Sequence, residues 1–281
     1  MAYYQKKSPE QLQAEMNALT AQLEKGIEEV FTSGKITDYL TMMAKFPNYS
    51  ASNCLLIMLQ RPTAKHVCGY VTWKKEFNRH VKKGENAIHI IGGSPRKGKR
   101  KTKDENGKEV TEEYTYTKYF PCSVFADDQT EGDDIPELCK ELKNSVDNYV
   151  FIEEKLKSIA NVPIYIESTN SEAKGYFSPM ENKIVVQDGM SESQTIKTMV
   201  HELTHSILHC KGGIQESADR DTKEIQAESV AFIVCHHLGI ESDDYSFPYL
   251  ASWASEKGMK AVRENLDIIQ KTAFELIEKI A

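Results

Sequence analysis

Apolar residues recur every three or four positions near the start of the chain, which is the period of an amphipathic helix. Ser8 and Pro9 stand at the beginning of this stretch as a cap and a first helical residue, and Gly34 follows its end. The pattern predicts a long helix from Ser8 to Gly34 whose apolar face packs in a core. Shorter patterns of the same kind predict three further helices, over residues 36–45, 50–60 and 71–79.

The middle of the chain changes to the two-residue period of strands. Residues 87–91 are apolar, and Thr and Tyr alternate over 110–119 before the apolar run 120–125. The segment Asp104-Glu105-Asn106-Gly107 is typical of a tight turn because of its Asn-Gly pair. We expect a hairpin in which this turn joins residues 99–103 to 110–119.

An acidic stretch over residues 126–136 is poor in apolar residues, and we place a domain boundary there. Helices are predicted after it at 137–159, 191–209, 221–238 and 256–279, and strands at 162–167 and 183–187. The sequence therefore predicts an α+β fold of two domains. Residues 1–134 form a basic nucleic-acid-binding domain, and residues 135–281 form a second domain that carries the candidate metal ligands described below.

The composition excludes several classes of protein. The chain has 281 residues, of which 40% are hydrophobic, enough for a buried core. No apolar run approaches the roughly 18 residues that cross a bilayer, and the N-terminus lacks the apolar region of a secretory signal. The six cysteines are scattered without a CxxC pair. We expect a cytoplasmic protein with reduced thiols and no membrane partner.

Basic residues gather in the front half, whereas the back half is acidic. Residues 61–108 hold 14 Lys and Arg against 4 Asp and Glu, with aromatic residues among them. Cationic side chains bind phosphates and exposed rings stack on unpaired bases, so this composition predicts binding of single-stranded nucleic acid. Two plainer interpretations stay open: Trp73 and Phe77 fit a core stripe, and Arg96–Lys103 fits a solvated arm. The candidate contacts are Tyr70, Trp73, Lys74, Lys75, Arg79, Lys82 and Lys83.

The sharpest chemical signal is an HExxH motif in a predicted helix, His201-Glu202-Leu203-Thr204-His205. Residues four apart lie on one face of a helix, so both imidazoles can reach the same metal ion. Glu202 lies one position around the helix and can accept a proton from a water molecule. The plainer interpretation, a helix with two unrelated histidines, is disfavoured by the apolar positions on either side of the motif.

A zinc site also needs a third protein ligand and an open position. His209 lies about 12 Å along the helix axis from His201, too far to share the ion, so we expect it to support the site or to pack. Glu224 and Glu228 share one face of the following predicted helix. We select Glu224 as the ligand and Glu228 as the partner of a ligand histidine's outer nitrogen, with the reverse assignment as the alternative.

These ligands would hold one zinc ion, which lowers the pKa of a water molecule and polarises a carbonyl. The expected reaction is hydrolysis of a peptide bond, with Glu202 as the general base that later protonates the leaving amine. The tetrahedral oxyanion would need a further hydrogen-bond donor. Tyr176 and His209 are the candidates for this role.

Two sets of motifs in this order resemble the ArdC-type antirestriction proteins, and the resemblance covers nearly the whole chain. The front half is similar to their N-terminal single-stranded-DNA-binding domain through Gly69-Tyr70, Trp73-Lys74, Val81-Lys82-Lys83-Gly84-Glu85 and Gln129-Thr130-Glu131-Gly132. The back half resembles their zincin-type metallopeptidase domain, related to the ImmA/IrrE group, through Tyr176-Phe177-Ser178-Pro179, the HExxH motif and residues 224–231.

The resemblance implies a protein of plasmids or conjugative elements that protects incoming DNA from restriction. It implies single-stranded DNA and a protein substrate as partners and Glu224 as the third ligand, whereas the ImmA-like pattern has Asn where this chain has Glu228. One alternative is a non-catalytic protein that shields single-stranded DNA and has a structural or vestigial metal site, although Glu202 argues against it. Another is a peptidase that cleaves a repressor and is recruited to DNA by its basic face.

Overall fold

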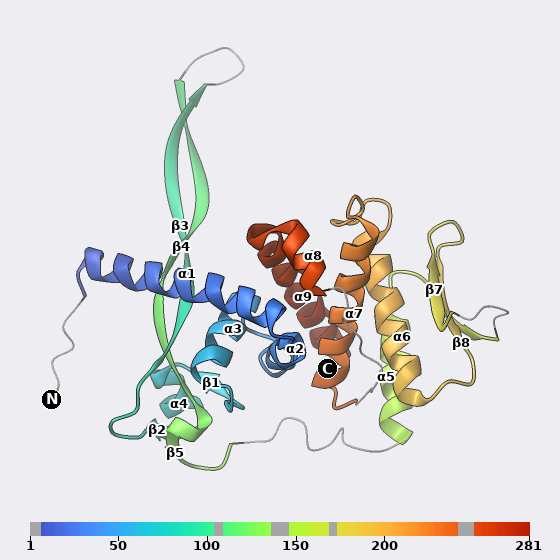
Figure 1. Ribbon diagram of the computed structural model, residues 1–281, viewed down its shortest axis with the longest axis horizontal. Helices are drawn as coiled ribbons and strands as arrows, with labels where there is room; N and C mark the ends of the chain where they lie inside the picture. The colour runs from blue at the N-terminus through green and yellow to red at the C-terminus, as the bar shows by residue number, and fades with distance from the viewer. Residues whose placement is uncertain (1–6, 104–108, 136–145, 169–172, 241–249) are drawn as a thin grey trace.

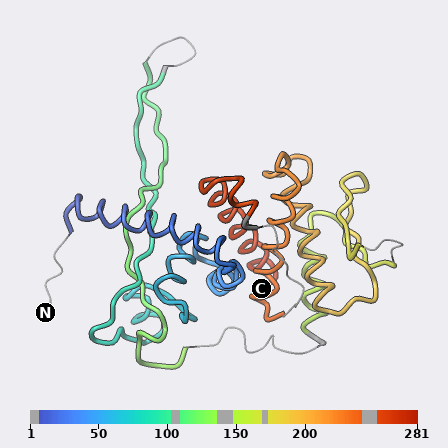
Figure 2. Tube along the Cα trace, in the orientation of Figure 1, coloured from blue at the N-terminus to red at the C-terminus, as the bar shows by residue number. Residues whose placement is uncertain are grey.

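The chain folds into two mixed regions of helices and strands that lie side by side (Figure 1). The computed structural model describes residues 7–103, 109–135, 146–168, 173–240 and 250–281. A group of helices with a long hairpin forms the front region, and a small sheet with the remaining helices forms the back region. The trace in Figure 2 shows the hairpin projecting away from the rest of the molecule.

Three helices of the front region agree closely with the predictions. They are α1 (Pro9–Thr32), α2 (Ile36–Lys45) and α3 (Ala51–Gln60). The Ser8 hydroxyl accepts a hydrogen bond from the backbone N–H of Gln11 at 3.2 Å, and the Ser8 backbone N–H donates to Gln11 Oε1 at 2.8 Å. This reciprocal cap satisfies two N–H groups at the start of α1.

The predicted hairpin is confirmed, but its first strand is longer than expected. β3 (Ile88–Lys103) and β4 (Glu109–Ala126) pair antiparallel along their length, and β1 (Val67–Cys68) pairs with the base of β4. Residues 92–98 contain glycines and charges that disfavour strands in isolation, and pairing with the Thr- and Tyr-rich β4 overrides this preference. The predicted turn at 104–107 lies outside the described residues.

The predicted helix over residues 71–79 is partly wrong. The helix found there is α4 (Tyr70–Glu76), and it ends before Arg79 because Arg79–Val81 forms β2, which pairs with β5 (Thr130–Gly132). Part of the acidic stretch therefore belongs to the front fold.

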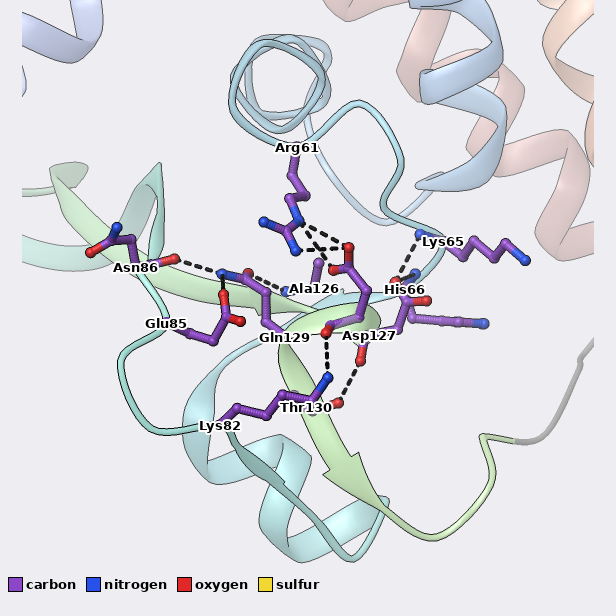
Figure 3. A network of polar contacts seen from close by, with 11 residues as sticks. Arg61, Lys65, His66, Lys82, Glu85, Asn86, Ala126, Asp127, Gln129 and Thr130 are labelled. Carbon is purple, nitrogen blue, oxygen red and sulfur yellow. Dashed lines mark hydrogen bonds and ion pairs between the residues drawn. The ribbon is translucent and has the colours of Figure 1, made fainter.

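Polar contacts hold this acidic stretch to the end of α3 and the loop that follows it (Figure 3). Asp128, in the 3-10 turn Asp127–Gln129, accepts a two-pronged ion pair from Arg61 with a shortest distance of 2.8 Å. The Asp127 carboxylate accepts from the backbone N–H groups of Lys65 and His66 at 2.9 and 3.2 Å. The Asp127 carboxylate replaces missing backbone partners, and with the Arg61–Asp128 ion pair it fixes in place an acidic segment that is poor in apolar residues.

The back region contains a three-stranded sheet of order β6-β8-β7. β6 (Ile164–Glu167) lies parallel to β8 (Lys183–Gln187), and β7 (Gly175–Ser178) pairs antiparallel with the other side of β8. β6 and β8 were predicted as strands. β7 was expected as a turn, because Gly175 and the Ser178-Pro179 pair are typical turn residues.

The helices of the back region are α5 (Val146–Ile159), α6 (Glu192–Thr204) and α7 (Arg220–His237), and these were predicted. Residues 137–145, the expected first part of α5, include no described residue. Most of the predicted helix 256–279 is α9 (Met259–Ile280), whereas residues 256 and 257 belong to a separate helix, α8 (Leu250–Lys257), which was not predicted. Gly258 separates them because its φ of 76° does not continue a right-handed helix.

The two regions share an interface rather than being joined only by a linker. α2 packs against α7, and α3 packs against α9. Gln270 of α9 donates from Nε2 to the backbone carbonyls of Phe46 and Tyr49, both at 3.1 Å, and His237 Nδ1 lies 2.8 Å from the Ala44 carbonyl. The domain limits at 134 and 135 stay a prediction, while the packing shows that the two parts support one another.

The mixture of helices and strands confirms the α+β class. Among the described helices, none has the length and apolar character that crossing a membrane requires. The cysteines within the described residues are all free, in agreement with reduced thiols.

Candidate metal centre

Two helices bring three candidate ligands together. α6 continues into one turn of π-helix, η2 (His205–His209), and packs against α7. The Nε2 atoms of His201 and His205 are 3.2 Å apart, and oxygens of Glu224 lie 3.5 Å from the first and 3.8 Å from the second. Among the described residues, these three side chains offer ligand atoms that all lie within 4.8 Å of one another, near enough to hold one metal ion.

The outer nitrogens of both histidines face other side chains. His201 Nδ1 lies 3.3 Å from Glu228 Oε2, and the other oxygen of Glu228 lies 2.8 Å from Nζ of the buried Lys197. His205 Nδ1 lies 2.9 Å from His209 Nδ1. Each imidazole therefore has a side-chain partner at Nδ1 and directs its Nε2 toward the space between the three candidate ligands. The structure brings Glu224, and not Glu228, in front of both Nε2 atoms.

The charged side chains of the site shift the pKa values of His201 and Glu224. Burial lowers the pKa of His201, but hydrogen bonds with Glu224 and Glu228 outweigh burial and raise that pKa to about 9. The hydrogen-bonding His201 and the neighbouring His205 ring hold the pKa of Glu224 far below its usual range. Without an ion, the site therefore contains a charged carboxylate and a protonated His201 at neutral pH.

Glu202 is buried on the face of α6 that lies against β7. Burial raises the pKa of its carboxyl, although the neighbouring histidines and a hydrogen bond from the Phe177 backbone act in the opposite direction. A Cβ atom added at Gly175 would stand 3.4 Å from Glu202 Cγ. The glycine lets the edge strand approach the helix, so the carboxylate of Glu202 is enclosed between β7 and the histidines.

The prediction of Tyr176 as an oxyanion donor is wrong. Gly175 faces α6 and Phe177 packs against the core, so the alternation of side chains along β7 directs Tyr176 to the opposite face of the sheet. Its register partner there is Val185. The prediction failed because the segment is a strand, in which neighbouring residues point in opposite directions.

His209 is not free to stabilise an oxyanion either. Its Nδ1 faces His205, and its Nε2 lies 2.8 Å from Gln226 Oε1. Burial lowers the pKa of His209 to about 4, so the ring is neutral at neutral pH. The geometry favours the other predicted role, support of the site, since both ring nitrogens have partners. Gln226 and Lys197 were missed because the sequence pattern alone does not distinguish them from other polar residues of a helix.

Trp73 is misassigned as a nucleic-acid contact. It is fully buried, and its indole N–H donates to the Phe125 carbonyl at 2.9 Å, so the ring cannot stack on a base. Its ring centroid lies 5.2 Å from that of Phe77, as the core-stripe interpretation implies. Four-residue spacing is common to buried and exposed helical faces, which is why the pattern did not separate the two.

The other candidate contacts differ in what their side chains already bind. Arg79 donates to the Thr130 side chain and backbone carbonyl, both at 2.9 Å, and also to the Asp133 carbonyl. Lys82 donates to the Asp128 carbonyl at 2.9 Å (Figure 3). These two residues therefore hold the acidic stretch in place. The exposed candidates are Tyr70, Lys74, Lys75, Lys82 and Lys83.

Comparison with known families matches both parts of the chain. Residues 5–125 match the family described as "N-terminal domain of anti-restriction factor ArdC". Residues 117–233 match the family described as "Putative metallopeptidase family (DUF6782)". The second match contains the HExxH motif and both glutamates of α7.

A relative and two solved structures are also similar. An uncharacterized protein of Bacillus anthracis, pXO2-81, is 24% identical over 319 residues, which cover 99% of this chain and 53% of that protein. The chain thus spans about half the length of this curated relative.

The metal-free crystal structure of the antirestriction protein ArdC from the R388 plasmid has a TM-score of 0.51 and 21% identity, covering 83% of this chain and 84% of that one. Its Mn(II)-bound structure has a TM-score of 0.49 and 18% identity, covering 83% of each chain. The metal-free structure shows a shared fold.

Proposed function

Because this chain joins an ArdC-type N-terminal domain to a metallopeptidase-family domain, we propose that it is an antirestriction protein with two activities. Its front part binds single-stranded DNA, and its back part hydrolyses a peptide bond of an unidentified protein at a zinc site. The observation that carries the hydrolase is the convergence of two imidazole nitrogens and one carboxylate beside the buried Glu202.

The residues present fit a tetrahedral zinc ion. With zinc–nitrogen bonds of about 2.0 Å, two ligand atoms of such an ion stand about 3.3 Å apart. The two Nε2 atoms are 3.2 Å apart, and the Glu224 oxygens at 3.5 and 3.8 Å need only a small shift. The Glu224 side chain is 53% exposed, so the group is accessible from solvent. His201, His205 and Glu224 would hold the ion.

When bound, zinc would polarise a substrate carbonyl and lower the pKa of a water molecule. The chain's own part in the reaction is proton transfer. Burial raises the pKa of the Glu202 carboxyl, which makes its carboxylate a stronger base for accepting a proton and for returning it to the leaving amine. The Phe177 backbone N–H and the close strand β7 keep this carboxylate beside the ligands.

The β3–β4 hairpin offers a surface for single-stranded DNA. Tyr114, Tyr116 and Phe120 alternate along one face of β4 and are all exposed. Arg96 lies opposite Tyr116 in the register, and the Arg100 guanidinium lies 5.7 Å from the Tyr114 ring centroid. Rings beside cationic groups are the combination that stacks on bases while contacting phosphates.

The hairpin also keeps positive charge that its own acidic residues do not neutralise. Its cross-strand ion pairs are Lys99–Glu113, Arg100–Glu112 and Lys101–Glu109. Within the described part of the chain, no ion pair engages Arg96, Lys97 or Lys118. This excess supports an electrostatic contribution to DNA binding.

Paired variants of the site test the hydrolase. His205→Ala removes a ligand and is expected to reduce zinc content to background, measured by elemental analysis of purified protein. Glu202→Gln keeps the ligands and should retain zinc but abolish cleavage. A proteomic comparison of cells expressing the native and Glu202→Gln chains should then show fragments with the native chain alone.

Two results would contradict the proposal. Stoichiometric zinc in His205→Ala would show that the ligands are assigned wrongly. Full protection of DNA from restriction by Glu202→Gln, with no native-specific cleavage, would favour the non-catalytic shielding protein instead.

A further inference from the structure

Gln226 is a buried polar residue of α7 that lies outside the candidate ligands. It is 0% exposed, so its amide needs partners within the protein. Its Nε2 lies 2.6 Å from Asn265 Oδ1 and 3.2 Å from Gln215 Oε1, and its Oε1 lies 2.8 Å from His209 Nε2. These contacts join α9 to the π-helical turn that begins at His205, the last residue of the HExxH motif.

Backbone carbonyls fix the direction of these hydrogen bonds. Asn265 Nδ2 donates to the Ala261 carbonyl at 2.8 Å, and Gln215 Nε2 donates to the Ile214 carbonyl at 3.1 Å. A carbonyl oxygen can only accept, so the side-chain oxygens of Asn265 and Gln215 are the atoms that face Gln226. Gln226 must therefore donate to both from its nitrogen, and its oxygen is the atom left for His209.

The Gln226 oxygen determines which nitrogen of His209 carries a hydrogen. It can only accept, so His209 Nε2 is the donor, and a neutral imidazole then has a lone pair on Nδ1. The atom facing this lone pair at 2.9 Å is His205 Nδ1, which must carry the hydrogen. His205 is left with its lone pair on Nε2, the atom that faces His201 and Glu224.

We infer, on the basis of the proposed metal site, that Asn265, Gln226 and His209 form a relay that holds His205 in its metal-binding tautomer. A histidine ligand must present a lone pair, and a ring held in the other tautomer must rearrange before it binds. The three residues act through His205 and not on the ion itself, so they are positioning residues. The orientation of His201 is fixed separately, by the Glu228 carboxylate that faces its Nδ1.

Gln226→Met tests the relay because it removes the amide and keeps a side chain of similar size. Zinc affinity, measured by competition with a chromophoric chelator, is expected to fall about 10- to 100-fold. Long-range ¹H–¹⁵N spectra of the metal-free protein at slightly alkaline pH should show His205 protonated on Nδ1 in the native chain. The variant should show a mixture of the two tautomers.

A matched control is Gln270→Met, since Gln270 is another buried glutamine, on α9 but outside the relay. It should lower stability and leave zinc affinity and the His205 tautomer unchanged. Asn265→Leu is a second relay variant, at a half-buried position, for use if Gln226→Met does not fold. It should weaken zinc binding in the same direction.

The outcomes separate the relay from the metal site. The relay is overturned if a folded relay variant keeps both the native zinc affinity and the native His205 tautomer. It is also overturned if Gln270→Met loses as much zinc affinity as Gln226→Met. If His201→Ala also leaves zinc binding unchanged, the proposed metal site itself is wrong.

Discussion

His201 stands between two carboxylates, with Glu224 in front of Nε2 and Glu228 behind Nδ1. Lys197 is 6% exposed and pairs with Glu228, so it compensates part of the negative charge gathered at the site. The spacing of residues along the sequence predicted that the two histidines and both glutamates belong to the site. It did not predict Lys197, because lysine is rarely buried and periodicity assigns it to the solvent side.

Zinc affinity is expected to depend on pH, because the ion must replace the proton on His201. The pKa of His201 is raised from 6.5 to about 9 in the metal-free fold. At pH values below 6.5, the histidine pKa of the unfolded chain, protonation of His201 contributes its full stabilisation to the metal-free fold. This stabilisation is lost as the pH rises through about 9, the pKa of His201 in the fold. Zinc affinity should therefore rise about tenfold per pH unit from neutral pH toward 9. Chelator competition at several pH values measures this, and a constant affinity would contradict a protonated His201.

Among the elements, the β3–β4 hairpin lacks a covering layer along most of its length. Residues 109–120 are all exposed, and a two-stranded ribbon alone is only marginally stable in water. The Tyr114 ring lies across the partner strand, since a Cβ at Gly98 would stand 2.8 Å from its Cζ. Lysines along β3 discourage pairing with the strands of other molecules. An exposed ribbon with rings on one face is suited to binding a flexible partner.

Removing the rings should weaken single-strand binding. The double variant Tyr114→Ala/Tyr116→Ala is expected to lower affinity for a labelled oligothymidine by about 30-fold or more, since each of the two stacked bases contributes at least about 1 kcal/mol. Fluorescence anisotropy measures this. Because the basic residues remain, the residual binding should still fall with added salt.

Thr115→Ala/Thr117→Ala is the matched control, because both threonines lie on the opposite face of the same strand. It should bind like the native chain. Equal losses in the two double variants would remove the stacking explanation and leave only ribbon stability. If the tyrosine variant binds DNA with native affinity, the DNA-binding site must lie elsewhere on the front part.

The sequence predicted long elements better than short ones. α1 to α3 and α7 are long enough for the helical period to be recognised, and their limits agree with the predictions within a few residues. β7 and the division between α8 and α9 were missed, because each depends on a few residues whose conformation is decided by packing. β7 is also the element that encloses Glu202, so this part of the site needed the structure.

At the scale of the whole molecule, the front and back parts are tied through helices that also carry the metal centre. α7 provides Glu224 and packs on α2, while α9 provides Asn265 and, five residues later, Gln270, which donates to front-half carbonyls. The acidic stretch suggested separate domains from composition. Composition could not predict this interface, because contacts between residues over 200 positions apart leave no local pattern.

A zinc-loaded crystal structure, with anomalous scattering recorded at the zinc edge, tests the central claim most directly. We predict a single peak about 2.0–2.2 Å from Nε2 of His201, Nε2 of His205 and one oxygen of Glu224. Glu228 should remain behind His201 Nδ1, and Glu202 should lie beside the open position. A peak bound by Glu228 in place of Glu224, or no peak between the two histidines, would contradict the account.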